Sequence, residues 1–578
     1  MKFSDNSPIC DEARWLGNEI FLLAGDAGFS PEDAEKIRKA TEALGNAVFS
    51  RKETCLPISD TENAAWLRAL CEKENPLISG NDSGKTPLVF DFTCKPETPT
   101  LYFKKHFDEE NAIARFVLAA VRAPSTPLSP RQKKIIEAGT ENGFGFALAD
   151  EQQAAVKTIR ERQIAVISGG PGTGKTSLLL RALIALLAEA PDAIIKIAAP
   201  TGKAAARIRE SVTRQIADID VEALSPLAAP CVLEKILKIT PTTLHRLLGL
   251  SAEKHRASAL DADIVIMDEA AMMSQSLTAQ LISALPPHAK LVLLGDKNQL
   301  DSVQPGHVFG DFYASDALKH SRAALVNSHR FSRDQFIGKF AAAILEGASD
   351  TCLKLLAAPP PPEIRIEACD EIASRKQIEC VLEATLPDIL KNPPPDAAPE
   401  SLLQALDAAR ILTPTAEGPF GKNMINAVAR KIFAPNAPGE HFHGRPILIT
   451  RNAPEHALNN GDVGIILRSE DTRSFFAYFP DENGQARKIP AALLPEHESA
   501  YAMTIHKTQG SEFSRLSIFF PKNTHDGFYT RQLLYTAVTR LKETPQSRFC
   551  FCFDAESVAK AVRHSALPHS LLPARLKA

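Results

Sequence analysis

The sequence predicts an α/β protein built around parallel sheets, and the order of its apolar segments is the reason. Four short apolar runs alternate with segments of helical periodicity. These runs lie at residues 164–168, 194–199, 264–267 and 291–294. Continuous apolar runs between helices are typical of parallel strands that are covered on both faces. Similar runs resume at residues 410–413 and end at 548–553, so we expect two units of the βαβ kind.

Length and composition exclude several classes of protein. The chain has 578 residues and a mass of 62.7 kDa, which corresponds to about three to four domains. Apolar residues make up 44% and charged residues 23%, which excludes a disordered tail protein, a collagen-like chain and a coiled-coil rod. The formal net charge is −3 and the pI about 6.6. This balance excludes a globally basic coat for nucleic acid but leaves room for a local basic channel.

The cysteines and the first residues favour a reducing compartment. Ten cysteines include no CxxC pair, and the one close pair, Cys550 and Cys552, lies inside an apolar run. We therefore expect free thiols. The first residues are polar, without the apolar core of a signal peptide. The most apolar segment, residues 178–188, is shorter than a membrane span and contains Arg181. These features predict a soluble cytoplasmic protein.

Proline-rich segments suggest where the domains divide. Residues 1–122 read as a mainly helical domain with a short strand at 101–103, followed by prolines at 124, 127 and 130. The first α/β unit is expected at 145–358 and the second at 400–578, because runs of proline at 359–362 and 393–395 lie between them. Strand-like runs separated by turns predict a small β insertion at about 440–500.

One motif places a nucleotide in the first α/β unit. Residues 169–176 match the pattern GxxxxGK[ST], after a predicted strand and before a predicted helix. Glycines let backbone N–H groups surround phosphate oxygens, and the helix dipole attracts the same anion. Lys175 is expected to reach the β- and γ-phosphates, and the Thr176 hydroxyl to bind Mg²⁺. The predicted ATP contacts are Gly169, Gly170, Pro171, Gly172, Thr173, Gly174, Lys175, Thr176 and Ser177.

Two further strand ends carry groups suited to hydrolysis. Asp268 and Glu269 follow the apolar run at 264–267. Asp268 is expected to hold Mg²⁺, and Glu269 to polarise the attacking water. Gln299 follows the run at 291–294 and a Gly-Asp pair, which could place its amide as a γ-phosphate sensor.

The order of the motifs resembles that of superfamily 1 helicases. The phosphate loop is followed by APTGKAA (199–205), DEA (268–270), GDKNQL (295–300), AMTIHKTQGSEF (502–513) and LLYTAVTR (533–540). Within that superfamily the stretches resemble the RecD family, the alpha subunits of bacterial exodeoxyribonuclease V. Recognisable motifs cover about residues 148 to 540, roughly two-thirds of the chain.

The resemblance implies an architecture, an activity and partners. It implies two RecA-like P-loop domains, an SH3-like β insertion, and an ATP-dependent DNA helicase that moves 5′→3′. It also implies single-stranded DNA, duplex ends, and RecB-like and RecC-like subunits as partners in double-strand break repair by homologous recombination. The N-terminal domain would dock those partners, so deletion of residues 1–110 is expected to spare ATPase activity. Nuclease activity would belong to the complex, because no nuclease-type carboxylate cluster is evident in this sequence.

The resemblance also carries individual residue roles. Gln152, four residues after Leu148, would contact adenine, and Glu512 would lie at the nucleotide. Arg330 and Arg540 would act as arginine fingers, which in phosphoryl transfer supply about 10³- to 10⁵-fold in rate. Because Arg540 lies in the second α/β unit, hydrolysis would depend on closure of the cleft.

A second group of residues is expected to face DNA. Hydroxyl, imidazole and ammonium groups in loops at strand ends suit contacts with phosphates, which position a strand without reading its sequence. The candidates are Thr201, Lys203, Thr243, His245, Thr504, His506 and Lys507. Base-stacking aromatics are not evident. Phe309, Phe312 and Phe331 are candidates, but core packing is favoured for each of them.

Other interpretations stay open. Ala271 stands where the family usually has serine, which weakens the expected coupling between the nucleotide and DNA sites. A free-standing RecD-like helicase is disfavoured by the short N-terminal region. A regulatory DNA-binding subunit with dispensable ATPase is disfavoured by the intact set of motif residues, and a P-loop ATPase unrelated to DNA by the order of the motifs.

Overall fold

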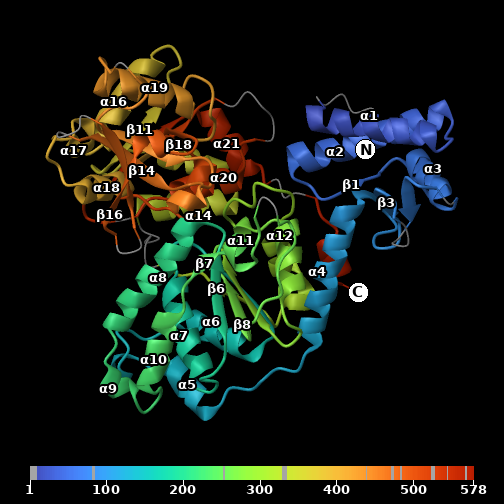
Figure 1. The fold of residues 1–578 in the computed structure, drawn as a ribbon, viewed down its shortest axis with the longest axis horizontal. Helices are drawn as coiled ribbons and strands as arrows, with labels where there is room; N and C mark the ends of the chain where they lie inside the picture. The colour runs from blue at the N-terminus through green and yellow to red at the C-terminus, as the bar shows by residue number, and fades with distance from the viewer. Residues whose placement is uncertain are drawn as a thin grey trace.

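The computed structural model forms three groups of elements, which Figure 1 shows. The N-terminal elements (blue) and the second α/β unit (orange to red) both lie against one end of the first α/β unit (cyan to green). The structure describes residues 9–73, 75–80, 85–251, 254–328, 335–437, 439–469, 474–481, 484–522, 528–542, 544–565 and 569–577. Within these residues, no helix combines the length and the apolar content that crossing a bilayer requires.

The N-terminal region combines helices with a small sheet. Its elements are α1 (Asp11–Asp26), α2 (Pro31–Arg51), β1 (Leu56–Pro57), α3 (Thr61–Cys71), β2 (Ile78–Gly80), β3 (Leu88–Asp91), β4 (Thr100–Phe103) and α4 (Lys104–Arg122). The sheet order is β1-β4-β3-β2, with only β2 and β3 parallel. The sequence predicted β4 alone, because strands of two to four residues are too short to show a period.

Small residues let α1 and α2 pack closely. A Cβ added at Gly45 would lie 2.8 Å from the Ala13 Cβ, and one at Gly17 would lie 2.5 Å from the Glu42 Cγ. The buried faces of both helices join a core that includes Ile37 and Leu44. The same close approach leaves large apolar side chains of the two helices outside that core, among them Trp15 and Phe49.

The first α/β unit is built on a six-stranded parallel sheet, as the sequence predicted. Its order is β10-β5-β9-β8-β6-β7. The strands are β5 (Ile164–Gly169), β6 (Ile195–Ala199), β7 (Thr242–Thr243), β8 (Ile264–Met267), β9 (Lys290–Gly295) and β10 (Arg322–Leu325). Its central strands are buried on both faces, which explains why they read as continuous apolar runs.

Helices cover both faces of this sheet. One face packs against α5 (Pro130–Glu137), α6 (Asp150–Glu161), α7 (Lys175–Leu187), α8 (Gly202–Ala217) and α10 (Pro230–Lys238). The other packs against α11 (Leu244–Leu247), α12 (Gln275–Ala284), α13 (Val308–Ala314) and, from the N-terminal region, α4. The short helix α9 (Val221–Leu224) lies near residues 140–143. Because α4 supplies Ile113 and Val117 to this core, the motor's packing begins well before residue 145.

The second α/β unit has a five-stranded parallel sheet of order β11-β20-β19-β12-β18. The strands are β11 (Ile364–Ala368), β12 (Ala409–Thr413), β18 (Ala502–Thr504), β19 (Arg515–Phe520) and β20 (Arg548–Phe553). One face packs against α14 (Phe336–Glu346), α15 (Ser349–Ala357), α20 (Arg531–Val538) and α21 (Ala555–Arg563). The other packs against α16 (Ser374–Thr385) and α19 (Lys422–Phe433).

These contacts place the start of the second unit earlier in the chain than the prolines suggested. Phe340 of α14 belongs to the core with Phe551 of β20, and β11 pairs with β20. Residues from about 336 onward therefore pack with the second sheet, although we expected this unit to begin at residue 400. Proline runs mark turns inside the unit here and do not mark its boundary.

An antiparallel sheet lies where the β insertion was expected. Its order is β16-β15-β14-β13-β17. The strands are β13 (Arg445–Ile449), β14 (Val463–Arg468), β15 (Phe475–Pro480), β16 (Ala486–Pro490) and β17 (His497–Ser499). One face has its own core around Ile447 and Ile466, and Ile465 on the other face packs against α17 (Asp388–Lys391) and α18 (Pro399–Ala408).

The end of the chain returns to the first unit. Leu572 and Leu576, in and just after α22 (Leu572–Arg575), are buried in the core that contains α4 and α13. Figure 1 accordingly places the C-terminus beside α4. The second α/β unit is therefore enclosed between two segments of chain that pack with the first.

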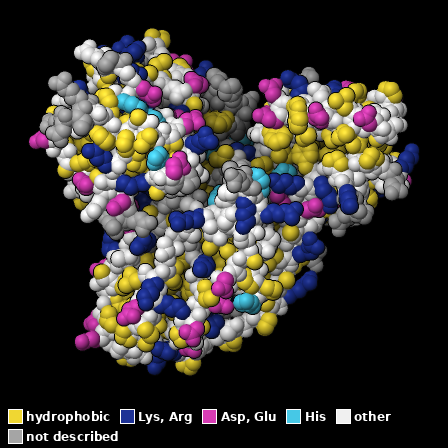
Figure 2. All heavy atoms as spheres, in the orientation of Figure 1, with side chains coloured by type: hydrophobic (Ala, Val, Ile, Leu, Met, Phe, Trp, Pro, Cys, Tyr) yellow, Lys and Arg dark blue, Asp and Glu magenta, His cyan; other side chains and the backbone are white. Residues whose placement is uncertain are grey.

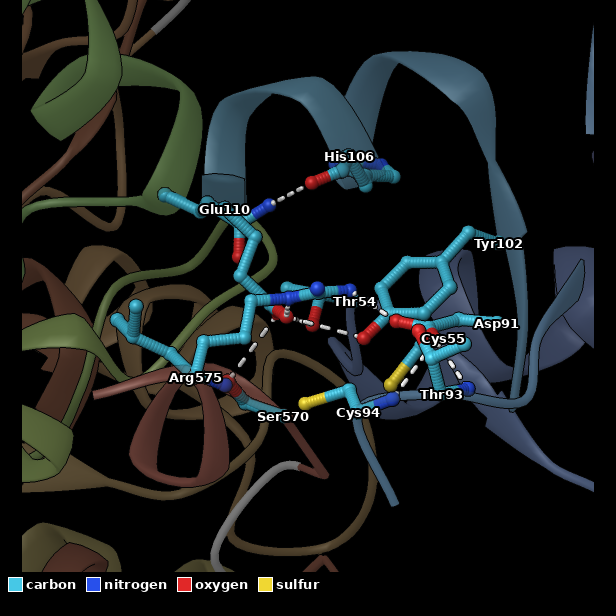
Figure 3. Close-up of polar contacts among 12 residues, drawn as sticks. Thr54, Cys55, Asp91, Thr93, Cys94, Tyr102, His106, Glu110, Ser570 and Arg575 are labelled. Atoms are coloured by element: carbon cyan, nitrogen blue, oxygen red, sulfur yellow. Dashed lines mark hydrogen bonds and ion pairs between the residues drawn. The ribbon is translucent and has the colours of Figure 1, made fainter. Parts of the chain in front are cut away.

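A buried ionic cluster fixes this return (Figure 3). The Arg575 guanidinium donates to Glu110 Oε1 at 2.7 Å and to Asp91 Oδ2 at 2.6 Å. Tyr102 donates its hydroxyl to Glu110 at 3.0 Å. Burial raises the pKa of Glu110, and Arg575 opposes that rise. Three segments of chain thus share one charge network, since Asp91 ends β3 and Glu110 lies in α4.

Removal of Arg575 should destabilise the protein more than removal of an exposed arginine. An Arg575→Met variant leaves Glu110 and Asp91 buried without their cation, which costs about 3–5 kcal/mol for a broken buried pair. The matched control is Arg563→Met, because that side chain is 65% exposed and pairs at 3.7 Å with Asp350, which is 83% exposed. Thermal unfolding and limited proteolysis measure the effect. Equal, small shifts for both variants would contradict the assignment.

Candidate nucleotide and nucleic-acid site

The phosphate loop has the geometry that its sequence predicts. It joins β5 to α7, and Gly172 and Gly174 have φ values of 75° and 80°, in the left-handed region that favours glycine. Thr173 donates its hydroxyl to the Gly170 carbonyl at 2.9 Å. The N-terminus of α7 begins at Lys175 and faces the loop. Backbone N–H groups and the positive end of a helix dipole therefore converge on one position, which suits a polyphosphate.

Lys175 and Asp268 lie at the same site. The Lys175 ammonium donates to the carbonyls of Gly169 at 2.6 Å and Gly170 at 3.1 Å. Burial and the charge of Glu269 raise the pKa of Asp268 to about 6, whereas the charge of Lys175 lowers it. Asp268 follows β8 directly, next to β9 in the sheet. An anionic oxygen thus faces the lysine of the phosphate loop, the arrangement that a magnesium nucleotide requires.

The backbone after Asp268 is strained. Glu269 has a φ of 51°, a conformation that costs a non-glycine residue about 1–3 kcal/mol. Asp268 Oδ1 accepts the Glu269 N–H at 2.8 Å, which stabilises the turn. Ala271, in the place of the usual serine, is buried, and its N–H lies 3.2 Å from where a Cβ on Gly295 would stand. The segment after β8 therefore contacts the end of β9 by close packing, without a hydroxyl.

Arg540 reaches across the cleft to Gln299. Its guanidinium donates to Gln299 Oε1 at 2.8 Å, and Gln299 in turn donates to Asp296 Oδ2 at 3.0 Å. Both Arg540 and Gln299 are buried. The sequence predicted both residues as catalytic but did not predict that they touch. The bond joins the end of β9 in the first unit to the end of α20 in the second.

Three more residues of the second unit reach the first. A Cβ added at Gly170 would lie 2.9 Å from the Tyr535 hydroxyl. Thr536 Oγ1 accepts the Leu300 N–H at 2.9 Å, and Gln509 donates to the Leu300 carbonyl at 2.8 Å. Sequence reasoning assigned these three residues no role, although all lie inside motifs that it recognised. Nothing in the sequence around these three residues showed that their side chains would face the other unit.

Gln152 contacts the phosphate loop itself. Its side-chain N–H donates to the Thr173 carbonyl at 3.0 Å, and its Oε1 accepts the Ala149 N–H at 3.1 Å. A pocket of about 230 Å³ lies beside α7 and is lined by Phe144, Phe146, Ser177 and Arg181 among others. The predicted contact of Gln152 with adenine stays a prediction. Its observed role is to hold Gly174, where a Cβ would lie 2.4 Å from its Nε2.

The structure brings several of the predicted DNA-facing residues to one edge of the cleft. The register of β6 and β7 pairs Ala199 with Thr243, which places Thr201 near Thr243. Each threonine begins a helix, and its hydroxyl accepts a backbone N–H, that of Ala204 at 3.2 Å and of Arg246 at 3.3 Å. His245, two residues after Thr243, is exposed.

The remaining candidates come from both units. Lys203 pairs with Asp407 of α18 at 2.6 Å, and burial lowers the pKa of Lys203. Thr504 ends β18, and the exposed Lys507 donates to Asn460, in the loop before β14, at 3.1 Å. Arg207 of α8 donates to the Gly510 carbonyl at 2.6 Å, which joins the first unit to the segment after β18 in the second. The antiparallel sheet therefore borders the same edge.

Other predicted residues are placed elsewhere or lie outside the description. Phe309 and Phe312 are buried in the first core, as core packing requires. Arg330 and Phe331 lie outside the described residues. The Glu512 carboxylate lies 4.0 Å from Arg207 of α8, and its predicted contact with the nucleotide stays a prediction. All ten cysteines are free thiols, as expected.

The chain has two parallel α/β sheets. The first carries a phosphate loop, and Arg540 of the second unit bonds Gln299 of the first. These features define a two-domain P-loop helicase motor. The family models agree, since residues 147–359 match an AAA domain and residues 499–544 a UvrD-like helicase C-terminal domain. The chain is 33% identical to the RecBCD enzyme subunit RecD of Mycolicibacterium smegmatis, over 84% of this chain and 82% of that protein. It belongs to the RecD family.

Other relatives extend the comparison. The RecBCD enzyme subunit RecD of Haemophilus influenzae is 27% identical over 92% of this chain and 85% of its own length. The ATP-dependent RecD2 DNA helicase of Deinococcus radiodurans is 27% identical over 68% of this chain, but only 48% of that protein is covered. Among solved structures, Bacteroides Pif1 bound to ssDNA matches with a TM-score of 0.38 and 16% identity, over 71% of this chain and 94% of that one.

Substitution of Arg540 should slow hydrolysis with little effect on ATP binding. Arg540→Ala removes a cation from the cleft and leaves the Gln299 amide without its partner, so kcat should fall about 10³-fold and KM for ATP should change little. Arg540→Lys, which keeps the charge but not the planar fork, should recover only part of the rate. DNA-stimulated ATPase kinetics measure both. Arg548→Ala, at an exposed arginine of β20, is the control, and equal rates for it and Arg540→Ala would refute the role.

Proposed function

We propose that this chain is the ATP-dependent 5′→3′ DNA helicase and translocase subunit of an exodeoxyribonuclease V-type complex. The observation that carries the proposal is the Arg540–Gln299 bond at 2.8 Å, which joins the two α/β units directly beside the phosphate loop. Membership of the RecD family supports the same activity. In this proposal, residues of both units contact the nucleotide, so ATP turnover is linked to the separation of the two units.

The nucleotide site fits a magnesium nucleotide. In the proposed arrangement Lys175 binds the β- and γ-phosphates, the Thr176 hydroxyl and the Asp268 carboxylate hold Mg²⁺, and Glu269 orients the attacking water. The donor set is suitable because Mg²⁺ prefers hydroxyl and carboxylate oxygens. Mg²⁺, when bound, neutralises charge that develops on the phosphate oxygens.

Closure of the cleft is proposed to complete the site. Gln299 bonds Arg540 on one side and Asp296 on the other. Asp296 also bonds the Tyr535 hydroxyl, and burial together with Asp296 raises the pKa of Tyr535 well above its usual range. A γ-phosphate that competes for Arg540 would release Gln299 and shift α20. Hydrolysis would restore the amide bond, so each turnover moves the second unit once.

The edge that holds Thr201, Thr243, Thr504 and Lys507 is the proposed track for single-stranded DNA. Residues from both units contribute to it, and Arg207 and Gly510 touch across it. Movement of one unit relative to the other would therefore pull the strand. The direction of movement, 5′→3′, is part of the proposal.

Unwinding by the purified chain should need the phosphate loop and a 5′ single strand. With ATP and Mg²⁺, the chain should separate a duplex that has a 5′ overhang and leave one with a 3′ overhang intact. Lys175→Gln should abolish unwinding, because the loop loses the cation that binds the β- and γ-phosphates. A gel-based strand-separation assay measures this. Unwinding from the 3′ overhang alone would overturn the polarity, and activity in Lys175→Gln would overturn the site.

The N-terminal region is proposed to dock RecB-like and RecC-like subunits in a heterotrimer. Figure 2 shows hydrophobic side chains gathered over this region. Trp15 and Leu22 of α1 are 64% and 62% exposed and lie on the same side of the helix, seven residues apart. Phe49 of α2 is 50% exposed. Large exposed apolar side chains close together are typical of protein interfaces.

The structure changes the expected test of docking. Deletion of residues 1–110 would remove Glu110, which pairs with Arg575, and the first turns of α4, where the His106 carbonyl and the Glu109 carboxylate bond to α12 of the first unit. Such a deletion would therefore damage the motor, contrary to the expectation from sequence. Substitutions on the exposed face leave the core intact.

Paired charges on α1 should release the partners and spare the motor. Trp15→Asp with Leu22→Asp should abolish co-purification with RecB-like and RecC-like subunits, because two carboxylates would be buried in an apolar interface. ATPase activity of the isolated chain should stay unchanged. Ile372→Asp is the control, since Ile372 is fully exposed on the second unit. Co-purification that survives the double substitution would refute docking through this face.

Duplex-end binding and nuclease activity are proposed to belong to the complex as a whole. Duplex ends would be bound within the complex, and nuclease activity would belong to it. The described residues contain no group of three or more His, Cys, Asp or Glu side chains suited to a metal ion. The setting would be the cytoplasm, during double-strand break repair by homologous recombination. A free-standing RecD-like helicase is the alternative, and loss of all partner binding with full unwinding would favour it.

A further inference from the structure

The chain leaves the first motor unit directly beside the phosphate loop. The edge strand β10 pairs with β5 in a register that sets Leu325 opposite Gly169. A Cβ added at Gly169 would lie 2.9 Å from the Leu325 Cβ, so this close approach requires glycine. Three residues later, the Ser328 hydroxyl donates to the Pro171 carbonyl at 2.9 Å. The chain that connects the two units therefore begins in contact with the phosphate loop.

Glu151 holds the two residues that lie between Leu325 and Ser328. Its Oε2 accepts the Val326 N–H at 3.0 Å, and its Oε1 accepts the Asn327 N–H at 2.9 Å. Both oxygens of the carboxylate are used, and hydrogen bonds to an ionised acceptor are about twice as strong as neutral ones. Because both donors belong to the backbone, the carboxylate fixes the path of the chain itself.

The residue next to Glu151 ties the same helix to the phosphate loop. Gln152 donates to the Thr173 carbonyl at 3.0 Å, and Glu151 and Gln152 are consecutive residues near the start of α6. Consecutive side chains on a helix do not face each other, so the two can reach different targets. One turn of α6 therefore joins the phosphate loop to the point where the chain leaves the first unit.

The connection leads to a helix that packs with α20. In the second unit, α14 begins at Phe336, and its Phe340 shares a core with Leu534 of α20. Arg540, which reaches across the cleft, follows the end of α20. Because Ser328 and α14 belong to one short stretch of chain, the position of Ser328 limits the positions that α14 can take.

We propose that Glu151 is a positioning residue that couples ATP turnover to movement of the second unit. By holding residues 326 and 327, it keeps the Ser328 hydroxyl on the Pro171 carbonyl. A change in the phosphate loop when ATP binds, or when phosphate leaves, is then passed to the connection and to α14. In this role Glu151 acts through Ser328 and not on the nucleotide itself. The inference rests on the proposed function of the two motor units and deepens it.

Glu151→Gln tests the proposal, because an amide has one acceptor oxygen where the carboxylate has two. The number of base pairs separated per ATP hydrolysed should fall about tenfold, the effect of losing one hydrogen bond to a charged group, with little change in KM for ATP. Strand separation from a 5′ overhang and DNA-stimulated ATPase activity are measured on the full-length chain under the same conditions. Glu151→Asp, which keeps both acceptors, should recover part of the coupling.

Ser328→Ala distinguishes this role from a general loss of stability. The variant removes the bond to Pro171 and leaves Glu151 in place, so it should lower the coupling by a similar factor. The double variant should be no worse than Glu151→Gln alone, since both residues act through one contact. Additive losses in the double variant would overturn the proposal.

The matched control is Asp150→Asn, which removes an exposed carboxylate from the same first turn of α6. It changes the charge at the helix N-terminus as Glu151→Gln does, and it should keep wild-type coupling. The thermal midpoint reports the folding of each variant. Wild-type coupling in a folded Glu151→Gln variant would overturn the role of Glu151 alone. Wild-type protein that neither hydrolyses ATP with DNA nor separates strands would instead overturn the proposed function, and this inference with it.

Discussion

The Arg540–Gln299 bond is the interaction on which the working of this structure depends. A buried guanidinium must be satisfied, and here its partners include an amide of the opposite unit and carbonyls of its own. Because the amide is neutral, the bond is weaker than a pair of guanidinium and carboxylate would be. A carboxylate at the position of Gln299 would hold the arginine much more firmly. An amide at this position therefore joins the two units less firmly than a carboxylate would.

The packing around this bond explains why it forms. Thr536 and Gln509 bond the main chain at Leu300, and Tyr535 lies against Gly170. These contacts fix α20 against the segment after β9, so Arg540 at the end of that helix cannot rotate away independently. Ala271 adds close packing between the ends of β8 and β9.

Much of this could be predicted from the sequence, for a physical reason. Doubly covered parallel strands must be apolar throughout, so β5, β8 and β9 were evident, and a loop that surrounds phosphate needs glycine at set positions. Of the four short N-terminal strands, in contrast, only β4 was predicted, because strands of two to four residues show no period. Proline runs suggested a boundary near residue 400, yet α14 and β11 pack earlier. Side chains that meet across the cleft, such as Tyr535 and Gln509, depend on how the units sit together, which no local pattern encodes.

The C-terminal segment gives the chain an unusual path. The chain leaves the first unit after Leu325 of β10, enters the second at α14, and returns after α21 to place Leu572 in the first core. The second unit is thus attached at two points, whereas a domain at the end of a chain is attached at one. A body held at two points can turn about the line that joins them but resists twisting in other directions. Two attachments therefore restrict the ways in which the second unit can move relative to the first, and the cluster around Arg575 fixes the second of these attachments.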